Sequence, residues 1–248
     1  MALREDIEKQ GNWLFRWRSY FPFLFIPILF MGLRNARILE KIFGDAASDF
    51  WETCAIIFSF GGLLVRCITV GYVPRGTSGR NTKWQAAETL NTTGIYSIVR
   101  NPLYLGNCII VFGIGLFIQV WWIALLMVVV FLVYYERIIF AEEEFLRKKF
   151  GGQFTEWAEK TPAIIPHFKS WKKPTLPFSF KTVLRREFST YFSIVATFFF
   201  LEVITIFLTQ KRFSMHSSWV IFFIVSLAIY FTLLILKKKT KLLNVPGR

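Results

Sequence analysis

The chain has 248 residues, of which 54% are hydrophobic and 19% are aromatic, and its mean hydropathy is +0.45. So much apolar surface excludes an ordinary water-soluble domain of this length. The net charge of +14 comes from basic residues between apolar runs rather than on one soluble module, which argues against nucleic-acid binding. Three cysteines in or beside apolar runs and two distant histidines predict neither a disulfide framework nor a metal site.

The first predicted element is an amphipathic helix over residues 3–18. Leu3, Ile7, Leu14 and Trp17 recur in it at helical spacing, and basic residues between them suit lipid head groups. We expect this helix to lie in the membrane interface, or equally to serve as a plain helical lead-in to the first span.

Six apolar runs follow, and a bilayer crossing takes about 20 such residues. The runs predict spans at residues 20–33 (or as far as 39), 50–72, 103–118, 120–140, 190–209 and 218–236. The third and fourth are almost contiguous and predict a tight helical hairpin. Gly61 and Gly62 in the second run would allow close helix packing. The predicted fold class is an all-α integral membrane protein with about six transmembrane helices, an N-terminal interfacial helix and a cytosolic cofactor-binding segment.

The distribution of charge predicts the orientation of these spans. If both termini are cytosolic, 25 of the 30 Lys and Arg residues lie inside. The five outside would be Arg34, Arg37, Lys41, Lys211 and Arg212. Cationic loops are retained in the cytosol, so the asymmetry favours this orientation.

Two polar junctions carry the residues that could do chemistry. The first precedes the third span and combines Gly94, Tyr96, Arg100 and Tyr104 with a proline suited to a helix start, Pro102. Arg100 could be only a membrane-edge anchor, and the tyrosines only interfacial aromatic residues. Together they could instead line a nucleotide pocket, where Gly94 would permit close backbone approach.

The second junction is the carboxylate cluster Glu142-Glu143-Glu144, at the end of the fourth span. On a surface helix, Glu143–Arg147 and Glu144–Lys148 would be ordinary ion pairs four residues apart. Three carboxylates beside a membrane are nevertheless costly without partners or water. A cationic or hydroxyl-rich ligand would suit them.

These motifs, in their order and spacing, resemble the isoprenylcysteine carboxyl methyltransferase and phospholipid methyltransferase superfamily. The resemblance covers residues 94–166 and rests on Gly94-Ile95-Tyr96, Arg100-Asn101-Pro102-Leu103-Tyr104-Leu105-Gly106, Glu142-Glu143, Leu146, Phe150-Gly151, Pro162 and Pro166. It implies an integral membrane enzyme that uses S-adenosylmethionine and admits a membrane lipid or lipidated substrate sideways from the bilayer.

The resemblance also implies roles for individual residues. Arg100, Asn101 and Tyr104 would be catalytic, and Arg100 would also hold an anionic acceptor through its guanidinium fork. The cofactor would be bound by Gly94, Tyr96, Pro102, Leu103, Glu142 and Glu143. The corresponding division of the chain is an interfacial helix at 1–19, two spans at 20–72, a catalytic core at 73–187 and a C-terminal hairpin with a basic tail at 188–248.

Two departures from the superfamily pattern and one further resemblance bear on the acceptor. Many members of the superfamily have His where this chain has Asn101, which cannot act as a base near neutral pH. Members of the superfamily commonly have tyrosines after the Phe-Gly pair, which is Phe150-Gly151 in this chain, whereas this chain has Phe154 and Trp157 there. The segments 76–81 and 92–93 resemble a bacterial branch that includes enzymes methylating a phosphate of lipid A, which implies a bacterial inner-membrane location. An anionic acceptor such as a lipid phosphate is therefore favoured; a prenylcysteine carboxylate and the amine of phosphatidylethanolamine are the alternatives.

Outside the resemblance, Glu202 is a further candidate for substrate binding, because a carboxylate inside a span usually faces a cavity or a partner. It could equally be protonated and merely hydrogen-bonded. Two rival functions are a membrane reductase related to sterol reductases, which would bind NADPH, and a non-catalytic membrane scaffold.

Overall fold

The computed structural model describes residues 2–33, 36, 38–74, 76–77, 85, 87–210 and 215–248. The predictions that involve Arg34, Arg37, Lys211, Arg212 and residues 78–81 lie outside this part of the chain. Within it the elements are helical, apart from one isolated antiparallel bridge between Gly94 and Lys172. The predicted all-α membrane fold is confirmed.

Four helices are long and apolar enough to cross a bilayer: α4 (Asp45–Tyr72), α6 (Trp121–Phe150), α8 (Phe180–Gln210) and α9 (Ser217–Lys239). Two shorter apolar helical segments accompany them, Phe21–Leu33 and α5 (Pro102–Phe117). The first of these is split into a 3-10 turn, η1 (Phe21–Leu24), and α2 (Phe25–Leu33). Pro22 and Pro27 account for this split, because proline lacks the amide donor of a regular helix.

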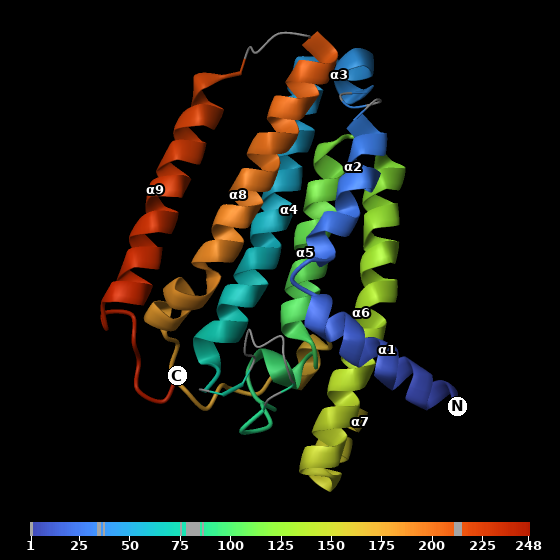
Figure 1. Cartoon of the computed structure of the whole chain (residues 1–248), viewed down its shortest axis with the longest axis vertical. Coiled ribbons are helices and arrows are strands. Elements are labelled where there is room, and N and C mark those ends of the chain that lie inside the picture. Colours follow the sequence, from blue (N-terminus) through green and yellow to red (C-terminus); the bar gives the residue numbers. More distant parts are fainter. Residues whose placement is uncertain are drawn as a thin grey trace.

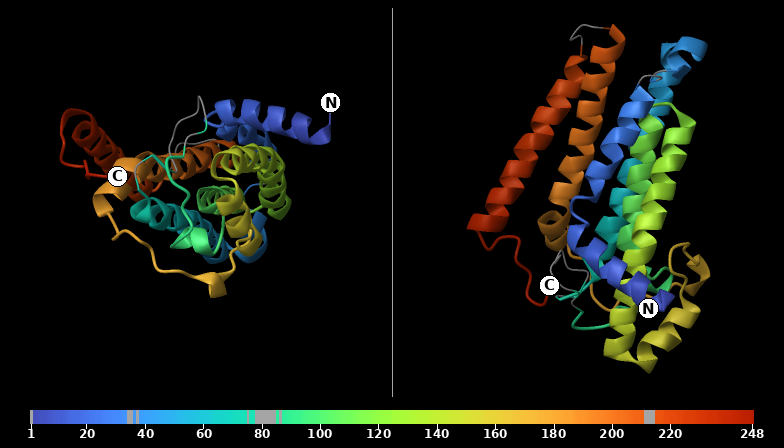
Figure 2. Two further views of the ribbon diagram at one scale, coloured as in Figure 1. Left: turned by 90° about the horizontal axis from the view of Figure 1, so that it is seen from below. Right: turned by 45° about the vertical axis from the view of Figure 1, so that its right-hand side comes forward.

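The four long helices and α5 stand side by side in the order α6, α5, α4, α8 and α9 (Figure 1). Helices α1 (Leu3–Trp17) and α2 both pack on α6, and the short α3 (Ile38–Phe43) packs on α4. Both ends of the chain lie at the same end of the bundle as α7 (Gly152–Lys160), as the two further views also show (Figure 2). The loop before α5, with its 3-10 turn η2 (Ile95–Ser97), and the segment after α7, with η3 (Phe168–Ser170), lie at this end too.

The α4–α5 pair is held close by small residues. A Cβ added at Gly62 would lie 2.5 Å from the Gly106 carbonyl oxygen, and one at Gly113 would lie 2.6 Å from the Ala55 carbonyl oxygen. The prediction of close packing therefore holds for Gly62, whereas a Cβ at Gly61 would meet open space.

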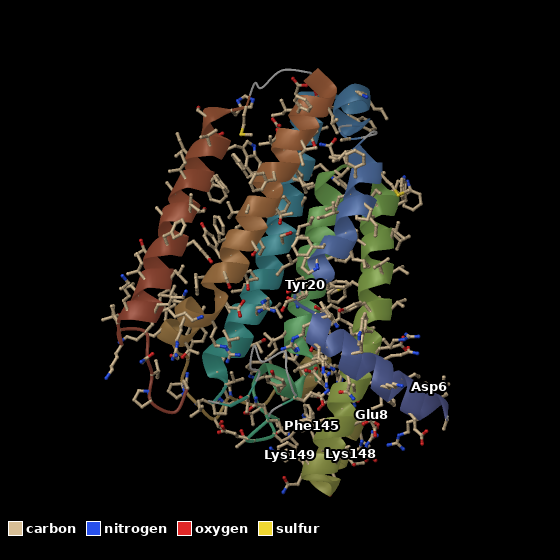
Figure 3. The ribbon with its side chains drawn as sticks, viewed as in Figure 1. Asp6, Glu8, Tyr20, Phe145, Lys148 and Lys149 are labelled. Atoms are coloured by element: carbon tan, nitrogen blue, oxygen red, sulfur yellow. The ribbon has the colours of Figure 1, made fainter. Side chains whose placement is uncertain are left out.

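Helix α1 packs along α6, and its predicted position in the membrane interface stays a prediction. Gly11 admits the contact, because a Cβ there would lie 2.1 Å from the Arg137 carbonyl oxygen. Phe15 is buried beside it, whereas the predicted apolar residues Leu3 and Trp17 are 75% and 50% exposed. Figure 3 shows Glu8 of α1 over Lys148 of α6, with 2.6 Å between the carboxylate and the ammonium.

The fourth predicted span is longer than expected. Helix α6 does not end near Phe140 but continues to Phe150 and stops at Gly151, whose φ of +54° favours glycine. The three glutamates therefore lie on one continuous helix and point in different directions around it. The hairpin prediction is confirmed, since only residues 118–120 separate α5 from α6.

Candidate functional site

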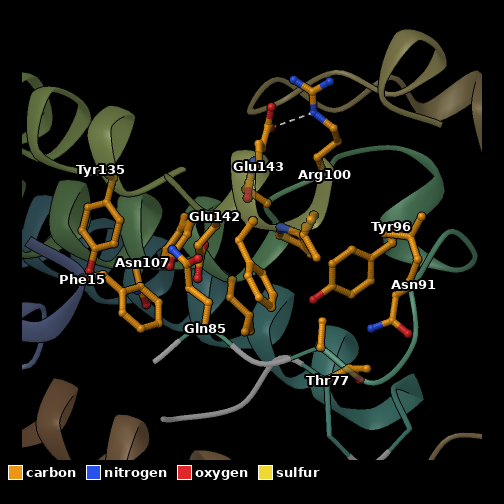
Figure 4. Close-up of a pocket in the computed structure, with 18 of the residues that line it drawn as sticks. Phe15, Thr77, Gln85, Asn91, Tyr96, Arg100, Asn107, Tyr135, Glu142 and Glu143 are labelled. Carbon is orange, nitrogen blue, oxygen red and sulfur yellow. Dashed lines mark ion pairs between the residues drawn. The ribbon is translucent and has the colours of Figure 1, made fainter. Parts of the chain in front are cut away.

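A cavity of about 540 Å³ lies at the polar end of the bundle, and its wall comes from α1, α4, α5, α6, α7, α8 and the loop before α5 (Figure 4). This volume is in the range of roughly 300–1,000 Å³ that small-molecule sites occupy. Eight of the ten predicted site residues line it: Tyr96, Arg100, Asn101, Pro102, Leu103, Tyr104, Glu142 and Glu143.

Gly94 and Glu202 are the two predicted residues that do not line the cavity. Gly94 has a φ of +60° and its amide donates to the Lys172 carbonyl at 2.9 Å, so it is needed for a turn between two loops. Glu202 is buried in α8, about 22 Å further along the helix than Glu187 at 1.5 Å per residue. The structure does not bring either residue to the other eight, and their predicted roles stay predictions.

The cavity floor is made of two loops that are hydrogen-bonded to each other. Residues 94–101 precede α5 and residues 157–172 include the end of α7 and the segment after it. The bonds, donor first, are Trp157 Nε1 to Tyr96 O (3.1 Å), His167 N to Ile98 O (2.9 Å), Arg100 N to Pro162 O (2.9 Å), Arg100 Nη1 to Ala158 O (2.7 Å), Asn101 Nδ2 to Ala163 O (3.1 Å) and Lys172 N to Ser97 Oγ (2.9 Å). These hydrogen bonds give the main-chain groups of the two loops their partners, although the loops form no β-sheet.

Arg100 connects the two loops to α6. Its Nε lies 3.0 Å from Glu143 Oε1, and both side chains are less than one-fifth exposed. Figure 4 places the Arg100 guanidinium beyond Glu143, on the side away from Tyr135 and Asn107. The ion pair and the bond to the Ala158 carbonyl therefore occupy much of the fork that was predicted to hold an acceptor.

Glu142 faces a different set of partners. It hydrogen-bonds the Tyr104 hydroxyl and lies 3.6 Å from the Arg18 guanidinium, which also donates to that hydroxyl at 3.3 Å. The Arg18 guanidinium in turn stacks over the Phe15 ring, 4.0 Å from its centroid. The end of α1 thus closes one side of the cavity over a carboxylate of α6.

A second cluster of polar side chains, which was not predicted from the sequence, lines the cavity. Arg66 of α4 makes a bidentate ion pair with Glu187 of α8, at 2.8 and 2.9 Å, and donates to Asn107 of α5 at 2.7 Å. Asn107 also hydrogen-bonds Tyr135 of α6. Arg66, deep within the apolar run 50–72, was the available signal, since a charged residue in such a run needs a partner or a cavity.

Glu144 turns away from the cavity. It is 2% exposed and pairs with Arg4 of α1 and with Arg147 on its own helix. These contacts, and the pair between Lys148 and Glu8, replace the ordinary pairs considered for Glu143 and Glu144. Among the residues described, no group of three or more His, Cys, Asp or Glu side chains is placed to hold a metal ion.

Residues 54–153 match the phospholipid methyltransferase family. This segment of the chain is similar to that family. The resemblance inferred from the motifs is therefore confirmed, and the matched segment spans most of α4, all of α5 and all of α6. Arg18 and Glu187 lie outside it, so parts of the chain on either side of the matched segment complete the cavity.

Two curated proteins are similar to this chain. The cobalt-zinc-cadmium resistance protein CzcN of Cupriavidus metallidurans is 29% identical over 137 residues, which are 54% of this chain and 61% of the relative. The nickel-cobalt-cadmium resistance protein NccN of Alcaligenes xylosoxydans xylosoxydans is 30% identical over 126 residues, 50% of this chain and 56% of the relative. The chain spans less than two thirds of either relative, and no solved structure matches it.

Proposed function

We propose that this protein is an S-adenosylmethionine-dependent membrane methyltransferase that O-methylates an anionic group of a lipid, with a lipid phosphate as the preferred acceptor. The observation that carries the proposal is the cavity itself, whose wall combines two carboxylates of the matched segment, Glu142 and Glu143, with aromatic side chains such as Tyr96 and Tyr135. Carboxylates suit the ammonium and ribose hydroxyls of the cofactor. Tyrosine rings stabilise a cationic sulfonium through their π faces.

The residues divide into binding and positioning roles. Glu142, held by Tyr104 and Arg18, binds a polar group of the cofactor. Arg100 acts through Glu143, whose carboxylate it holds at the cavity wall, and this role fits its contacts better than direct anchoring of an acceptor.

Methyl transfer from a sulfonium to a phosphate or carboxylate oxygen is an in-line displacement. The acceptor already carries the negative charge that attacks the methyl carbon, so no base is required, and an asparagine at position 101 is compatible with the reaction. Orientation of the two reactants can contribute about 7–11 kcal/mol. An amine acceptor would need a proton removed, which this cavity serves less well.

The lipid reaches the cavity from the membrane interface. Exposed aromatic residues surround Arg18 in the sequence, and their rings form a continuous row of Trp13, Trp17, Tyr20 and Phe23 with centroids 5.5–6.5 Å apart. Such rings prefer the level of the head groups. This row supports a cavity mouth at the bilayer surface. The charge distribution supports the cytosolic face, and the resemblance to a bacterial branch supports the inner membrane.

The names of the two relatives associate those proteins with resistance to divalent metals. Methylation of a phosphate removes negative charge from the lipid and so weakens metal binding at a membrane surface. Loss of this protein would then raise the sensitivity of its host to cadmium or zinc, in parallel with loss of the methylated lipid.

The test is binding of S-adenosylhomocysteine to the purified full chain in lipid nanodiscs, measured by calorimetry. Glu142→Gln removes a charge-assisted contact worth about 1.5–3 kcal/mol, so affinity should fall roughly 10- to 150-fold. Glu136→Gln is the matched control, because Glu136 lies on the same helix with a side chain that is 75% exposed. Melting temperatures without ligand separate loss of binding from loss of fold.

The acceptor is tested by mass spectrometry of lipids from cells with and without the gene. The expected result is an anionic lipid heavier by one methylene, absent when the gene carries Glu142→Gln. Binding of NADPH in place of S-adenosylhomocysteine would refute the proposal in favour of a reductase. A mass shift confined to a protein C-terminus would move the acceptor to a prenylcysteine carboxylate.

A further inference from the structure

A second cavity, of about 690 Å³, lies beside the first and is strongly basic. It is bounded by the start of α8, the end of α9 and the C-terminal segment that follows α9. Its lining includes the basic residues Arg185, Arg186, Lys237 and Arg248, and none of the lining residues is acidic. The two cavities share Gly76, Thr77 and Arg186.

The C-terminal segment that bounds this cavity is fastened to the bundle. Arg248 donates to the Gly71 carbonyl at 2.8 Å and to the Pro177 carbonyl, and Leu243 is only 4% exposed. Two short turns, Lys241–Asn244 and Val245–Arg248, are each closed by a main-chain hydrogen bond. These contacts hold the wall of the cavity in place, and Arg248 has a structural role because it ties the C-terminal segment to the bundle.

Arg185 and Lys237 are the lining residues placed to meet a ligand. Arg185 is half-buried and makes no hydrogen bond or ion pair with any residue that the structure describes. Lys237, on the last turn of α9, lies over the Phe188 ring at 5.1 Å from its centroid. A half-buried guanidinium that lacks a carboxylate partner is suited to a phosphate, which its planar fork can bind through two hydrogen bonds.

The surroundings point to a lipid as the source of that phosphate. Only 6% of the apolar window of α9 is buried, and Ile235, two residues before Lys237, is 53% exposed. Acyl chains lying along α9 would bring a head group to the level of Lys237 and Arg185. The basic cavity is thus at the depth where phosphates of the bilayer surface occur.

We propose that this basic cavity is a binding site for the phosphate head group of an anionic phospholipid. The site does not require the methyl-transfer activity proposed above, because its basic residues belong to α8, α9 and the segment after them, beyond residues 54–153; from within that range it takes Gly76 and Thr77. Its position next to the first cavity would hold an anionic lipid within reach of it.

The test measures binding of phosphatidic acid to the purified full chain in nanodiscs of phosphatidylcholine, by native mass spectrometry or lipid titration. Arg185→Gln should weaken binding about tenfold, the effect of losing one set of charge-assisted hydrogen bonds. Lys181→Gln is the control, because Lys181 is an exposed cation on the first turn of the same helix and does not line the cavity. Phosphatidylcholine itself should show no preference between wild type and Arg185→Gln.

Equal weakening by Arg185→Gln and Lys181→Gln would refute the site, because it would show diffuse attraction to a basic surface. Inorganic phosphate that displaces phosphatidic acid at equal concentration would overturn the assignment to a lipid. Binding of S-adenosylhomocysteine, which depends on the first cavity, should be unchanged by Arg185→Gln. Failure of the lipid site and failure of the methyltransferase proposal are therefore separate results.

Discussion

Two adjacent glycines of α4 give opposite predictions for the same substitution. Gly62→Ala would place a Cβ 2.5 Å from the Gly106 carbonyl oxygen and 2.8 Å from the Ile110 amide nitrogen, and both are backbone atoms that cannot rotate away. Gly61→Ala would place its Cβ where no heavy atom lies within 4 Å. Helices α4 and α5 must separate to accept the first change and need not move for the second.

The size of the effect follows from comparing the two variants. Each substitution stabilises the helix by the same amount, because Ala has a helix propensity about 1 kcal/mol more favourable than that of Gly. Overpacking at Gly62 costs about 1–3 kcal/mol on top of this. Since the propensity term cancels in the difference, Gly62→Ala should have a free energy of unfolding about 1–3 kcal/mol below that of Gly61→Ala.

The assay is thermal unfolding of both purified variants in the same detergent, followed by tryptophan fluorescence. A chain of this size changes its melting temperature by about 2–4 °C per kcal/mol, so the variants should differ by about 2–12 °C. Gly62→Ala should also weaken S-adenosylhomocysteine binding, because α5 carries Tyr104 into the cavity. If Gly61→Ala were the less stable of the two, the packing argument for α4 and α5 would be wrong.

Three further changes test the contacts around the cavity. Arg66→Met leaves Glu187 buried without its bidentate partner and should cost about 3–5 kcal/mol of stability, measured as a fall in melting temperature; no fall would mean that the pair is dispensable. Lys148→Met removes an exposed ion pair with Glu8 and should cost less than about 1 kcal/mol, so a large loss of stability would contradict its surface character. Ser97→Ala leaves the Lys172 main-chain amide, which donates to the Ser97 hydroxyl, without that acceptor. The free energy of unfolding should fall by about 1–3 kcal/mol, and hydrogen exchange should become faster only in the two loops of the cavity floor.

The sequence by itself determined the class of the fold and the central part of the site. Apolar runs of membrane length predicted the spans, because every such run must be buried in lipid or protein. The spacing of the motifs around Arg100 and Glu142 identified the family and eight residues that line one cavity. Local patterns were sufficient there because the residues belong to continuous motifs on either side of one hairpin.

The tertiary structure decided what completes that site. Arg18 at the end of α1, Arg66 of α4 and Glu187 of α8 lie far apart in the chain, and helix packing sets the partner of each. Helix packing likewise brings Arg4 and Glu8 of α1 to Glu144 and Lys148 in the charged last turns of α6. Periodicity specifies which face of a helix is apolar, but it does not specify which helix that face will meet, so these contacts could not be read from the sequence.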